Sequence, residues 1–325
     1  MDRYDERDTI FSRMELVPGS ERYKTYYARR PELEETDAGL RFAAGGTYRA
    51  GVIEQARVSS AFRFLHDTRP LATGRGQAAG LKPDRKPPPD KESFILTGSM
   101  LRDIAFDYGA VSFGYSALKM ECFYNVRGRG YEYGKPVSEP LRNALVYAVE
   151  MKREKVEKAP RVDETYEVAR GYIRAMVIGM ALSYFLRELG YRARSHLEGE
   201  SELVLPAAAR SAGLGEIGRM GLLLTDNYGP RVRLGAVTTD YPVDALPGEY
   251  MPVQEAGKVK QFCSKCGICA RRCPGKAIPE GEDLAESAET GKPQWTVNPE
   301  SCYSIWKKYG TDCGICVSVC PYGSA

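Results

Sequence analysis

The sequence predicts an α+β fold followed by a small cysteine-rich domain at the C-terminus. Between residues 93 and 239, segments with helical periodicity alternate with short apolar runs of strand length. Eight of the nine cysteines then fall between residues 263 and 320, in two runs that each close on Cys-Pro. A chain of 325 residues has room for two or three domains. We therefore expect an N-terminal covering segment at 1–92, a main domain at 93–260 and a cysteine domain at 261–325.

The N-terminal segment is mixed in character. Glycines at 45–46 and 74–80 predict loops, and the proline-rich, charged stretch 81–91 predicts an extended connector. We interpret residues 1–92 as a surface cover packed over the main domain.

The main domain contains four predicted strands or strand-like runs and three predicted helices. Residues 93–108 have the spacing of an amphipathic helix, whereas 109–115 and 142–150 are short apolar runs typical of strands. A solvated charge run at 152–158 precedes a helix that we expect from Asp163, as its N-cap, to about Leu189. An alanine-rich helix at 206–212 is followed by strand-like runs at 222–225 and 232–238, and residues 240–260 form a linker.

Composition and charge restrict the class of protein. Hydrophobic residues make up 43% of the chain and charged residues 27%, which is ordinary for a globular protein. Residues 261–325 contain seven Lys/Arg and seven Asp/Glu, so this region is not a basic nucleic-acid surface, and we expect no nucleic-acid partner.

The sequence shows no membrane or export signal. No run approaches the roughly 18 consecutive apolar residues of a membrane span, and the start of the chain lacks the apolar stretch of a secretory signal. Arg29-Arg30 is followed by proline and acidic residues, unlike a twin-arginine signal. We therefore expect a cytoplasmic protein without membrane association, in which clustered cysteines bind metal rather than form disulfides.

The cysteine spacing predicts two [4Fe–4S] clusters. Each C-x2-C-x2-C-x3-C-P run of bacterial ferredoxins gives its last cysteine to the other cluster. On this pattern one cluster is held by Cys263, Cys266, Cys269 and Cys320, and the other by Cys273, Cys302, Cys313 and Cys316. Two four-thiolate zinc sites are the alternative, disfavoured by the Cys-Pro endings. Cys122 lies alone among apolar residues and is interpreted as a buried thiol.

A glycine motif, Gly213-x-Gly215-x-x-Gly218, matches the dinucleotide-binding pattern in spacing only. That fingerprint requires a strand before it and a helix after it, and here the order is reversed. The glycines therefore indicate that backbone closely approaches something else, either another element or a large flat ligand.

These motifs together resemble those of the reductive dehalogenases. The similar stretches are 109–115, 212–225, 228–234, 239–240 and the double cysteine run with 302–313. The resemblance extends over 93–325, and residues 1–92 match no family.

The resemblance implies a base-off cobalamin, bound in a domain like the nitroreductase fold, and two [4Fe–4S] clusters that feed it electrons. It places the cobalamin contacts at Gly213, Gly215, Gly218 and Arg219. The chain has only two histidines, His66 and His196, and neither stands in an Asp-x-His-x-x-Gly arrangement that would supply a lower ligand to cobalt. We expect His196 to be a loop residue at the surface.

Carried over by position, the family's proton-donating tyrosine is Tyr172 and its basic partner is Arg233. Tyr184 is the competing tyrosine, and a core position is the alternative for Tyr172. A phenol has an ordinary pKa of about 10, and a nearby guanidinium favours the phenolate. We therefore expect Arg233 to lower the pKa of Tyr172 and ease proton delivery.

One departure from the family concerns the loop before the glycine motif. Many members carry an asparagine there, whereas this chain offers Glu198, Glu200 and Glu202. A carboxylate in place of an amide changes the charge that a substrate meets, so the substrate class stays open.

Three functions follow in order of preference. The first is a reductive dehalogenase acting on a small organohalide, in which cobalamin attacks the carbon–halogen bond and Tyr172 protonates the product carbon. Electrons would come from an external donor, a ferredoxin or flavodoxin, because the chain has no reductase module. The second is an epoxyqueuosine reductase-like enzyme acting on tRNA. That family usually carries a different glycine motif, and this chain lacks the surplus of basic residues that tRNA binding favours. The third is a non-enzymatic ferredoxin-like electron carrier.

Overall fold

The computed structural model describes residues 3–42, 50–72, 96–243, 246, 257–281, 284–286 and 293–323. Helices and antiparallel strands are mixed along the chain, as expected for the fold class. Within these residues, no helix combines the length and the apolar character needed to cross a bilayer.

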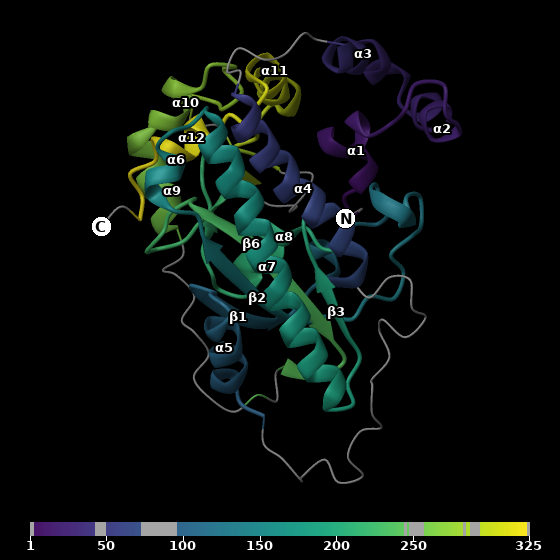
Figure 1. Cartoon of the computed structure of the whole chain (residues 1–325), viewed down its shortest axis with the longest axis vertical. Helices are drawn as coiled ribbons and strands as arrows, with labels where there is room; N and C mark the ends of the chain where they lie inside the picture. The colour runs from purple at the N-terminus through teal and green to yellow at the C-terminus, as the bar shows by residue number, and fades with distance from the viewer. Residues whose placement is uncertain are drawn as a thin grey trace.

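A four-stranded antiparallel sheet forms the centre of the molecule (Figure 1). Its strands lie in the order β1 (Ser112–Ala117), β2 (Asn143–Glu150), β6 (Val232–Thr239) and β3 (Ala193–His196). Asn143 pairs with both Ala117 and Thr239, which fixes the register of the central strand against its two neighbours.

The two faces of the sheet are covered by different helices. Side chains alternate along a strand, so Leu145, Tyr147 and Val149 of β2 face one core while Ala144, Val146 and Ala148 face the other. The first core is closed by α7 (Val162–Glu188) and α5 (Gly98–Asp107), and the second by α8 (Leu205–Ser211). The small residues on the second face let the alanine-rich helix pack closely.

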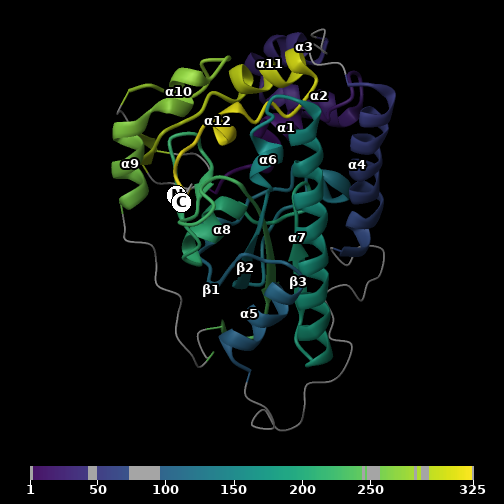
Figure 2. The same cartoon turned by 60° about the vertical axis from the view of Figure 1, so that its left-hand side comes forward.

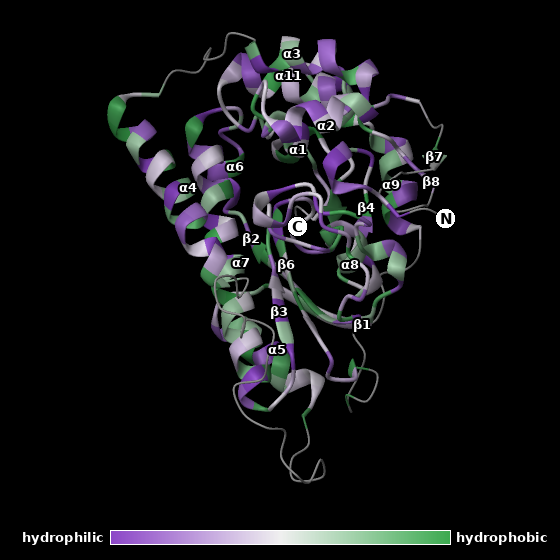
Figure 3. Cartoon of the chain, turned by 90° about the vertical axis from the view of Figure 1, so that its right-hand side faces the viewer, coloured by the Kyte–Doolittle hydropathy of each residue, from purple (hydrophilic) through white to green (hydrophobic). Residues whose placement is uncertain are grey.

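Two more helices lie against α7. The long helix α4 (Val52–Ala72) packs along its outer side, where Leu65 and Ala72 meet Met176, and Figures 2 and 3 show the two helices side by side. The short helix α6 (Arg153–Val156) forms where a solvated charge run was expected, and it buries Val156.

The cysteine region forms a layer of short helices at one end of α7, as Figure 2 shows. It contains α9 (Lys258–Cys266), α10 (Ile268–Arg272), α11 (Pro299–Tyr309) and α12 (Ile315–Ser318), with the hairpin β7 (Ala285–Glu286) and β8 (Pro293–Gln294). A second hairpin, β4 (Glu216–Ile217) and β5 (Leu223–Leu224), lies between this layer and α8.

The N-terminal segment is helical and packs on the cysteine layer as well as on the main domain. It contains η1 (Glu6–Asp8), α1 (Ile10–Met14), α2 (Glu21–Arg29), η2 (Pro31–Leu33) and α3 (Glu34–Phe42). Helices α1 and α3 contact α11. Residue Glu6 reaches the loop around η3 (Met120–Cys122) and η4 (Gly130–Glu132), where it accepts a bond from Gly128.

The predicted elements of the main domain are confirmed, with shifts of a few residues at their ends. The N-cap is wrong: Arg161 occupies that position without a side-chain bond, and Asp163 lies in the first turn beside Lys155 and Lys158. The expected loops at 45–46 and 74–80 and the connector at 81–91 lie outside the described residues.

The core between α7 and the sheet gives a direct stability test. Ile178 is fully buried, whereas its neighbour Val177 is 40% exposed. We expect Ile178→Ala to lower the free energy of unfolding by about 2–5 kcal/mol because it leaves a cavity. Val177→Ala serves as the control on the same helix and should change it by less than about 1 kcal/mol. Equal losses in denaturant unfolding would contradict this packing.

Candidate functional site

The structure brings the eight clustered cysteines into two groups of four. Burial, together with the neighbouring thiols of Cys263, Cys269 and Cys266, raises the pKa of the Cys320 thiol to about 11. The C-terminal cysteine therefore lies with the first three, although more than fifty residues separate them in sequence. This is the grouping that the spacing predicts for the first cluster.

The second group is equally compact. Burial raises the pKa of the Cys302 thiol to about 11, with smaller contributions from Cys313 and Cys273. The thiol of Cys316 lies near those of Cys302, Cys313 and Cys273. It also lies near Cys269 of the first group, so the two groups adjoin. That each group ligates a cluster stays a prediction. The interpretation of Cys122 as a buried thiol is confirmed, because it is 5% exposed in the core beneath α8.

Four thiols in each group, with N–H donors to their sulfurs, fit [4Fe–4S] clusters. Among the described residues, no three His, Cys, Asp or Glu side chains converge closely enough to hold one metal ion. In a cubane, iron and sulfide lie between the four thiolates, so wider spacing is expected. Backbone N–H groups of Arg219, Tyr322 and Ala277 donate to the sulfurs of Cys263, Cys320 and Cys273, respectively. Such bonds stabilise thiolate charge.

The glycine motif lies next to the first cysteine group. A Cβ on Gly215 would overlap the carbonyl oxygen of Leu224, and one on Gly218 would lie 2.6 Å from a methyl group of the same leucine. The close approach is therefore to the hairpin partner within this chain. As expected, the motif follows a helix and precedes a strand, so it lacks the dinucleotide-binding context.

Arg219, expected at the cofactor, directs its side chain to the cysteine layer. Its guanidinium donates to the carbonyl oxygens of Pro279 (2.9 Å) and Gly281 (2.6 Å) and stacks on Trp295, with Cζ 4.5 Å from the ring centroid. Only 1% of the residue is exposed. The Arg219 side chain therefore ties the glycine loop to the cysteine layer.

Tyr172 and Arg233 are brought together by the packing of α7 on β6. The guanidinium carbon of Arg233 lies 5.1 Å from the centroid of the Tyr172 ring. Tyr184, the competing tyrosine, lies three turns along α7, is 44% exposed and stacks with Arg187. The geometry favours Tyr172, whose role stays a prediction.

The expected direction of the Tyr172 pKa is wrong for the protein alone. Burial raises the pKa of Tyr172 to about 12, and the charge of Arg233 opposes this shift without reversing it. The phenol therefore keeps its proton at neutral pH. Desolvation of the partly buried phenol therefore outweighs the attraction of the guanidinium.

Two carboxyl groups, of Asp312 and Glu164, lie between the Tyr172–Arg233 pair and the cysteine layer. Asp312 precedes Cys313, and its backbone N–H donates to Thr165 Oγ1 of α7 at 3.2 Å. Glu164, one residue earlier on α7, is 2% exposed and contacts Gly314. Burial raises the pKa of Glu164 to about 7 and of Asp312 to about 6, and Arg233 opposes both shifts. The Nε of Arg233 and Oε2 of Glu164 are buried without a hydrogen bond within the described structure.

The loop before the glycine motif, which differs from that of the family, supplies the carboxylate of Glu198 to this site. Burial would raise the pKa of Glu198, but Arg129, Arg69 and Arg233 outweigh it and hold the pKa below its ordinary value. Arg129 forms an ion pair with Glu198 and another with Glu15 at 2.9 Å. A Cβ on Gly199 would lie 2.5 Å from Nη1 of Arg69, so this arginine also reaches the loop.

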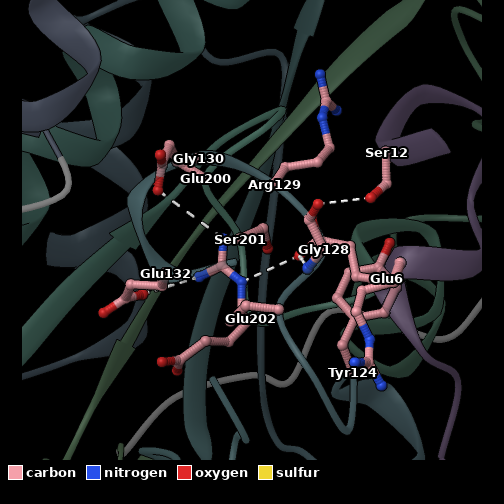
Figure 4. A network of polar contacts seen from close by, with 12 residues as sticks. Glu6, Ser12, Tyr124, Gly128, Arg129, Gly130, Glu132, Glu200, Ser201 and Glu202 are labelled. Carbon is pink, nitrogen blue, oxygen red and sulfur yellow. Dashed lines mark hydrogen bonds and ion pairs between the residues drawn. The ribbon is translucent and has the colours of Figure 1, made fainter. Parts of the chain in front are cut away.

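The other two glutamates of the loop belong to a buried network (Figure 4). Its centre is Arg127, which is 1% exposed and pairs with Glu6 (3.1 Å), Glu132 (3.2 Å) and Glu200 (3.8 Å). Glu202 joins the network through Arg194, which pairs with both Glu202 and Glu132. The N-terminal segment thus helps to hold the loop that presents Glu198.

His196 is not the surface loop residue that we expected. It is the last residue of β3 and is fully buried. Its Nε2 lies 2.8 Å from Thr238 Oγ1, and its Nδ1 accepts a bond from the Glu202 N–H at 3.2 Å. Burial, together with the charges of Arg194 and Arg127, holds the pKa of His196 well below its ordinary value. His66 is exposed on α4.

Comparison with known proteins agrees with this organisation. The 4Fe-4S dicluster domain family matches residues 262–324. A tetrachloroethene reductive dehalogenase of Sulfurospirillum multivorans is 37% identical over 190 residues, which cover 57% of this chain and 36% of that protein. An epoxyqueuosine reductase of Lactococcus garvieae is 33% identical over 122 residues, 37% of this chain and 32% of that protein. The chain thus spans about a third of the length of these curated relatives.

Solved structures establish the fold. A reductive dehalogenase whose structure suggests a mechanism for B12-dependent dehalogenation matches 99% of this chain and 41% of its own, with a TM-score of 0.72 and 23% identity. The catabolic reductive dehalogenase NpRdhA in complex with 3-bromo-4-hydroxybenzoic acid matches 99% of this chain and 42% of its own, with a TM-score of 0.67 and 23% identity. The chain therefore has the reductive dehalogenase fold, and its sequence is similar to that of the tetrachloroethene reductive dehalogenase.

Sequence reasoning missed Arg129, Arg69, Glu164 and Asp312. Arg129 and Arg69 reach Glu198 from distant segments without any motif, so nothing local identified them. Asp312 could have been found, because it directly precedes a cluster cysteine.

The burial of His196 predicts a pH dependence of stability. The unfolded chain binds a proton to this imidazole below about pH 6.5, whereas the folded chain does not, so its contribution is lost as pH falls. Between pH 6.5 and 5.5 we expect His196→Gln to remove about 1 kcal/mol of the acid-induced drop in unfolding free energy. His66→Gln is the control and should leave the drop unchanged. The same drop in all three proteins would contradict a neutral buried His196.

The cysteine grouping predicts a specific loss of iron. In anaerobically reconstituted protein, Cys273→Ser should reduce the bound iron by about half, because this residue belongs to the second group only. Cys122→Ser should retain the full iron content. Full iron in Cys273→Ser, or an equal loss in both variants, would exclude the predicted ligand set.

Proposed function

We propose that this chain acts as a cobalamin- and iron–sulfur-dependent reductive dehalogenase. The reaction consumes an organohalide, two electrons and a proton, and it releases the halide and the hydrogen-substituted product. One observation carries the proposal: Tyr172 and Arg233 form a pair beside the 311–314 segment of the cysteine layer. A proton donor thus lies next to the source of electrons.

The proposal includes a division of the chain into three parts. Residues 93–260 would form the cobalamin-binding catalytic domain, and the helix-covered antiparallel sheet supports the comparison with the nitroreductase fold. Residues 261–325 would form the ferredoxin-like domain, with the two cysteine groups as the cluster ligands. Residues 1–92 would cover the site, because Glu6, Glu15 and Arg69 reach Arg127, Arg129 and Gly199, respectively.

The chain's residues suit a base-off cobalamin. His66 is at the surface, and both ring nitrogens of His196 are within hydrogen-bond distance of protein groups, so neither histidine is available to ligate cobalt from below. The buried Nε of Arg233 and Oε2 of Glu164 lack hydrogen-bond partners, as expected where a polar ligand is to bind. When bound, cobalamin would supply the reductive cleavage of the carbon–halogen bond, with electrons from the clusters.

Tyr172 would deliver the proton from its phenolic oxygen. Burial keeps the phenol protonated until it is needed. Arg233 would stabilise the phenolate that remains after transfer, since the two groups are in contact. The pair would then take up a proton from solvent before the next turnover.

Glu198 would take the position of the family's pocket asparagine, because it reaches Arg129 and Arg233 while Glu200 faces Arg127. A substrate in this place meets charged groups, which favours a polar organohalide over a chlorinated alkene. The bromo-hydroxybenzoic acid bound to the structural neighbour NpRdhA is of that kind.

The remaining parts of the proposal concern location and supply. Nine cysteines without a disulfide suit a reducing compartment, so we propose a cytoplasmic protein that takes electrons from a ferredoxin or flavodoxin. The epoxyqueuosine reductase-like alternative is less supported, because that relative matches only 37% of the chain. A simple electron carrier would have no need of the Tyr172–Arg233 pair.

The test is halide release by the reconstituted protein from halogenated phenols and benzoates, with a chemical reductant. Tyr172→Phe should lose at least about a hundred-fold in rate, the scale of general acid catalysis, with normal corrinoid and iron content. Tyr184→Phe is the matched control on the same helix and should retain the rate. Full activity of Tyr172→Phe would remove this residue from the reaction, and no halide from the unaltered protein would contradict the proposed function.

A further inference from the structure

We propose that four exposed cations, Lys265, Arg271, Arg272 and Lys276, form the docking surface for an acidic one-electron carrier protein. We call these residues the basic face. The inference rests on the proposed function, since a dehalogenase of this kind needs an external source of electrons.

The basic face lies over the cysteine loops. Its residues alternate with Cys266, Cys269 and Cys273 within twelve residues of sequence, on α9, α10 and the turn that follows. All four cations are exposed, and Cys266 and Cys273 keep part of their surface accessible. Figure 2 shows α9 and α10 at the outer edge of the molecule, on the opposite side from α4.

Charge is concentrated here although residues 261–325 as a whole are balanced. The described stretch 257–281 holds six Lys or Arg and a single carboxylate, Glu280. Glu280 lies 3.7 Å from Lys276, and both side chains are more than half exposed, so this pair neutralises little. Among the described residues, no carboxylate pairs with Lys265 or Arg272.

Arg271 is held in place over the first cysteine loop. Its Nη2 donates to the carbonyl oxygen of Cys266 at 2.8 Å, and its Nη1 would lie 2.9 Å from a Cβ on Gly267. The guanidinium is therefore fixed at the surface directly above a predicted cluster ligand. A partner that approaches this charge also approaches the thiolates.

The opposite side of the second cysteine group is covered by the N-terminal segment. Helix α11 carries Cys302, and Trp306 donates a side-chain hydrogen bond to that thiol. Phe11 of α1 packs on Trp306 with ring centroids 5.3 Å apart, and Lys307 donates to the carbonyl oxygen of Arg41 at 3.2 Å. Electrons that enter the second group would therefore come in past Cys273, at the basic face.

Opposite charge is the recognition chemistry that such a transient encounter requires. An acidic carrier is steered to a basic surface over a distance set by ionic strength, about 30 Å at 0.01 M and about 8 Å at 0.15 M. Each docking would oxidise the carrier by one electron and reduce the protein by one. Two successive dockings would supply the two electrons of one dehalogenation.

The test measures binding directly. Oxidised bacterial flavodoxin of net negative charge is titrated into the reconstituted protein at low ionic strength, and the affinity is determined by calorimetry. The double charge reversal Arg272→Glu with Lys276→Glu should weaken binding at least about ten-fold. Added salt should weaken binding to the unaltered protein and reduce the difference between the two proteins.

A matched pair of variants keeps the result interpretable. Arg102→Glu with Lys119→Glu makes the same change in charge around α5 and η3, far from the cysteine layer, and should bind flavodoxin like the unaltered protein. The milder Arg272→Gln with Lys276→Gln should give an intermediate loss, which covers the case in which the charge reversal fails to fold. Halide release driven by a small chemical reductant should be normal in all three pairs.

Several outcomes would overturn the proposal. One is that flavodoxin does not bind the unaltered protein. Another is that the control pair loses as much affinity as the basic-face pairs, and a third is that both basic-face pairs keep the affinity of the unaltered protein. An RNA stem-loop that binds more tightly than flavodoxin and loses affinity in the same variants would assign the face to nucleic acid instead. Failure of the proposed function appears separately, as no halide release with the chemical reductant.

Discussion

The structure depends on the close approach of α7 to the central sheet. Two glycines on that helix, Gly171 and Gly179, make it possible. A Cβ on Gly171 would lie 2.7 Å from Cγ of Arg233, and one on Gly179 would overlap Ser195 Oγ of β3. The phenol of Tyr147 on β2 then donates to the carbonyl oxygen of Ala175 at 2.8 Å. Any larger side chain at these two positions would push the helix away from the sheet.

The close packing of α7 on the sheet determines where Tyr172 and Arg233 lie. Tyr172 follows Gly171 directly, so the contact that brings the helix to β6 also brings the phenol to Arg233. The cysteine layer contacts the start of the same helix, where the Asp312 N–H donates to Thr165 Oγ1 at 3.2 Å, and the segment before it, where Thr311 Oγ1 donates to the carbonyl oxygen of Pro160 at 2.7 Å. One helix therefore connects the sheet core, the proposed proton donor Tyr172 and the segment next to the second cysteine group. Burial of charged groups along it is the energetic cost.

Much of this arrangement could be predicted from local sequence. The cysteine grouping follows from the ferredoxin spacing pattern, α7 from its helical pattern of apolar residues, and β2 from a short apolar run of strand length. Tyr172 and Arg233 came from a resemblance rather than from the residues themselves. Their contact depends on tertiary packing that a helical pattern alone does not specify.

The errors at His196 and Tyr172 share one cause, which is burial produced by distant segments. His196 lies in a short polar stretch that reads as a loop, yet Thr238 on the neighbouring strand and Glu202 enclose it. The sign of the Tyr172 pKa was wrong because desolvation exceeds the effect of one guanidinium. The partner of Glu198 lies 69 positions away, at Arg129, and no spacing rule links them.

The central claim is that one chain holds two [4Fe–4S] clusters and a corrinoid beside the Tyr172–Arg233 pair. The most direct test is electron paramagnetic resonance of anaerobically reconstituted protein, poised at successive potentials. The account predicts a base-off cob(II)alamin signal, without nitrogen coupling from a lower ligand, together with signals of two reduced clusters. A base-on signal with nitrogen coupling, or protein that takes up clusters and no corrinoid, would contradict it.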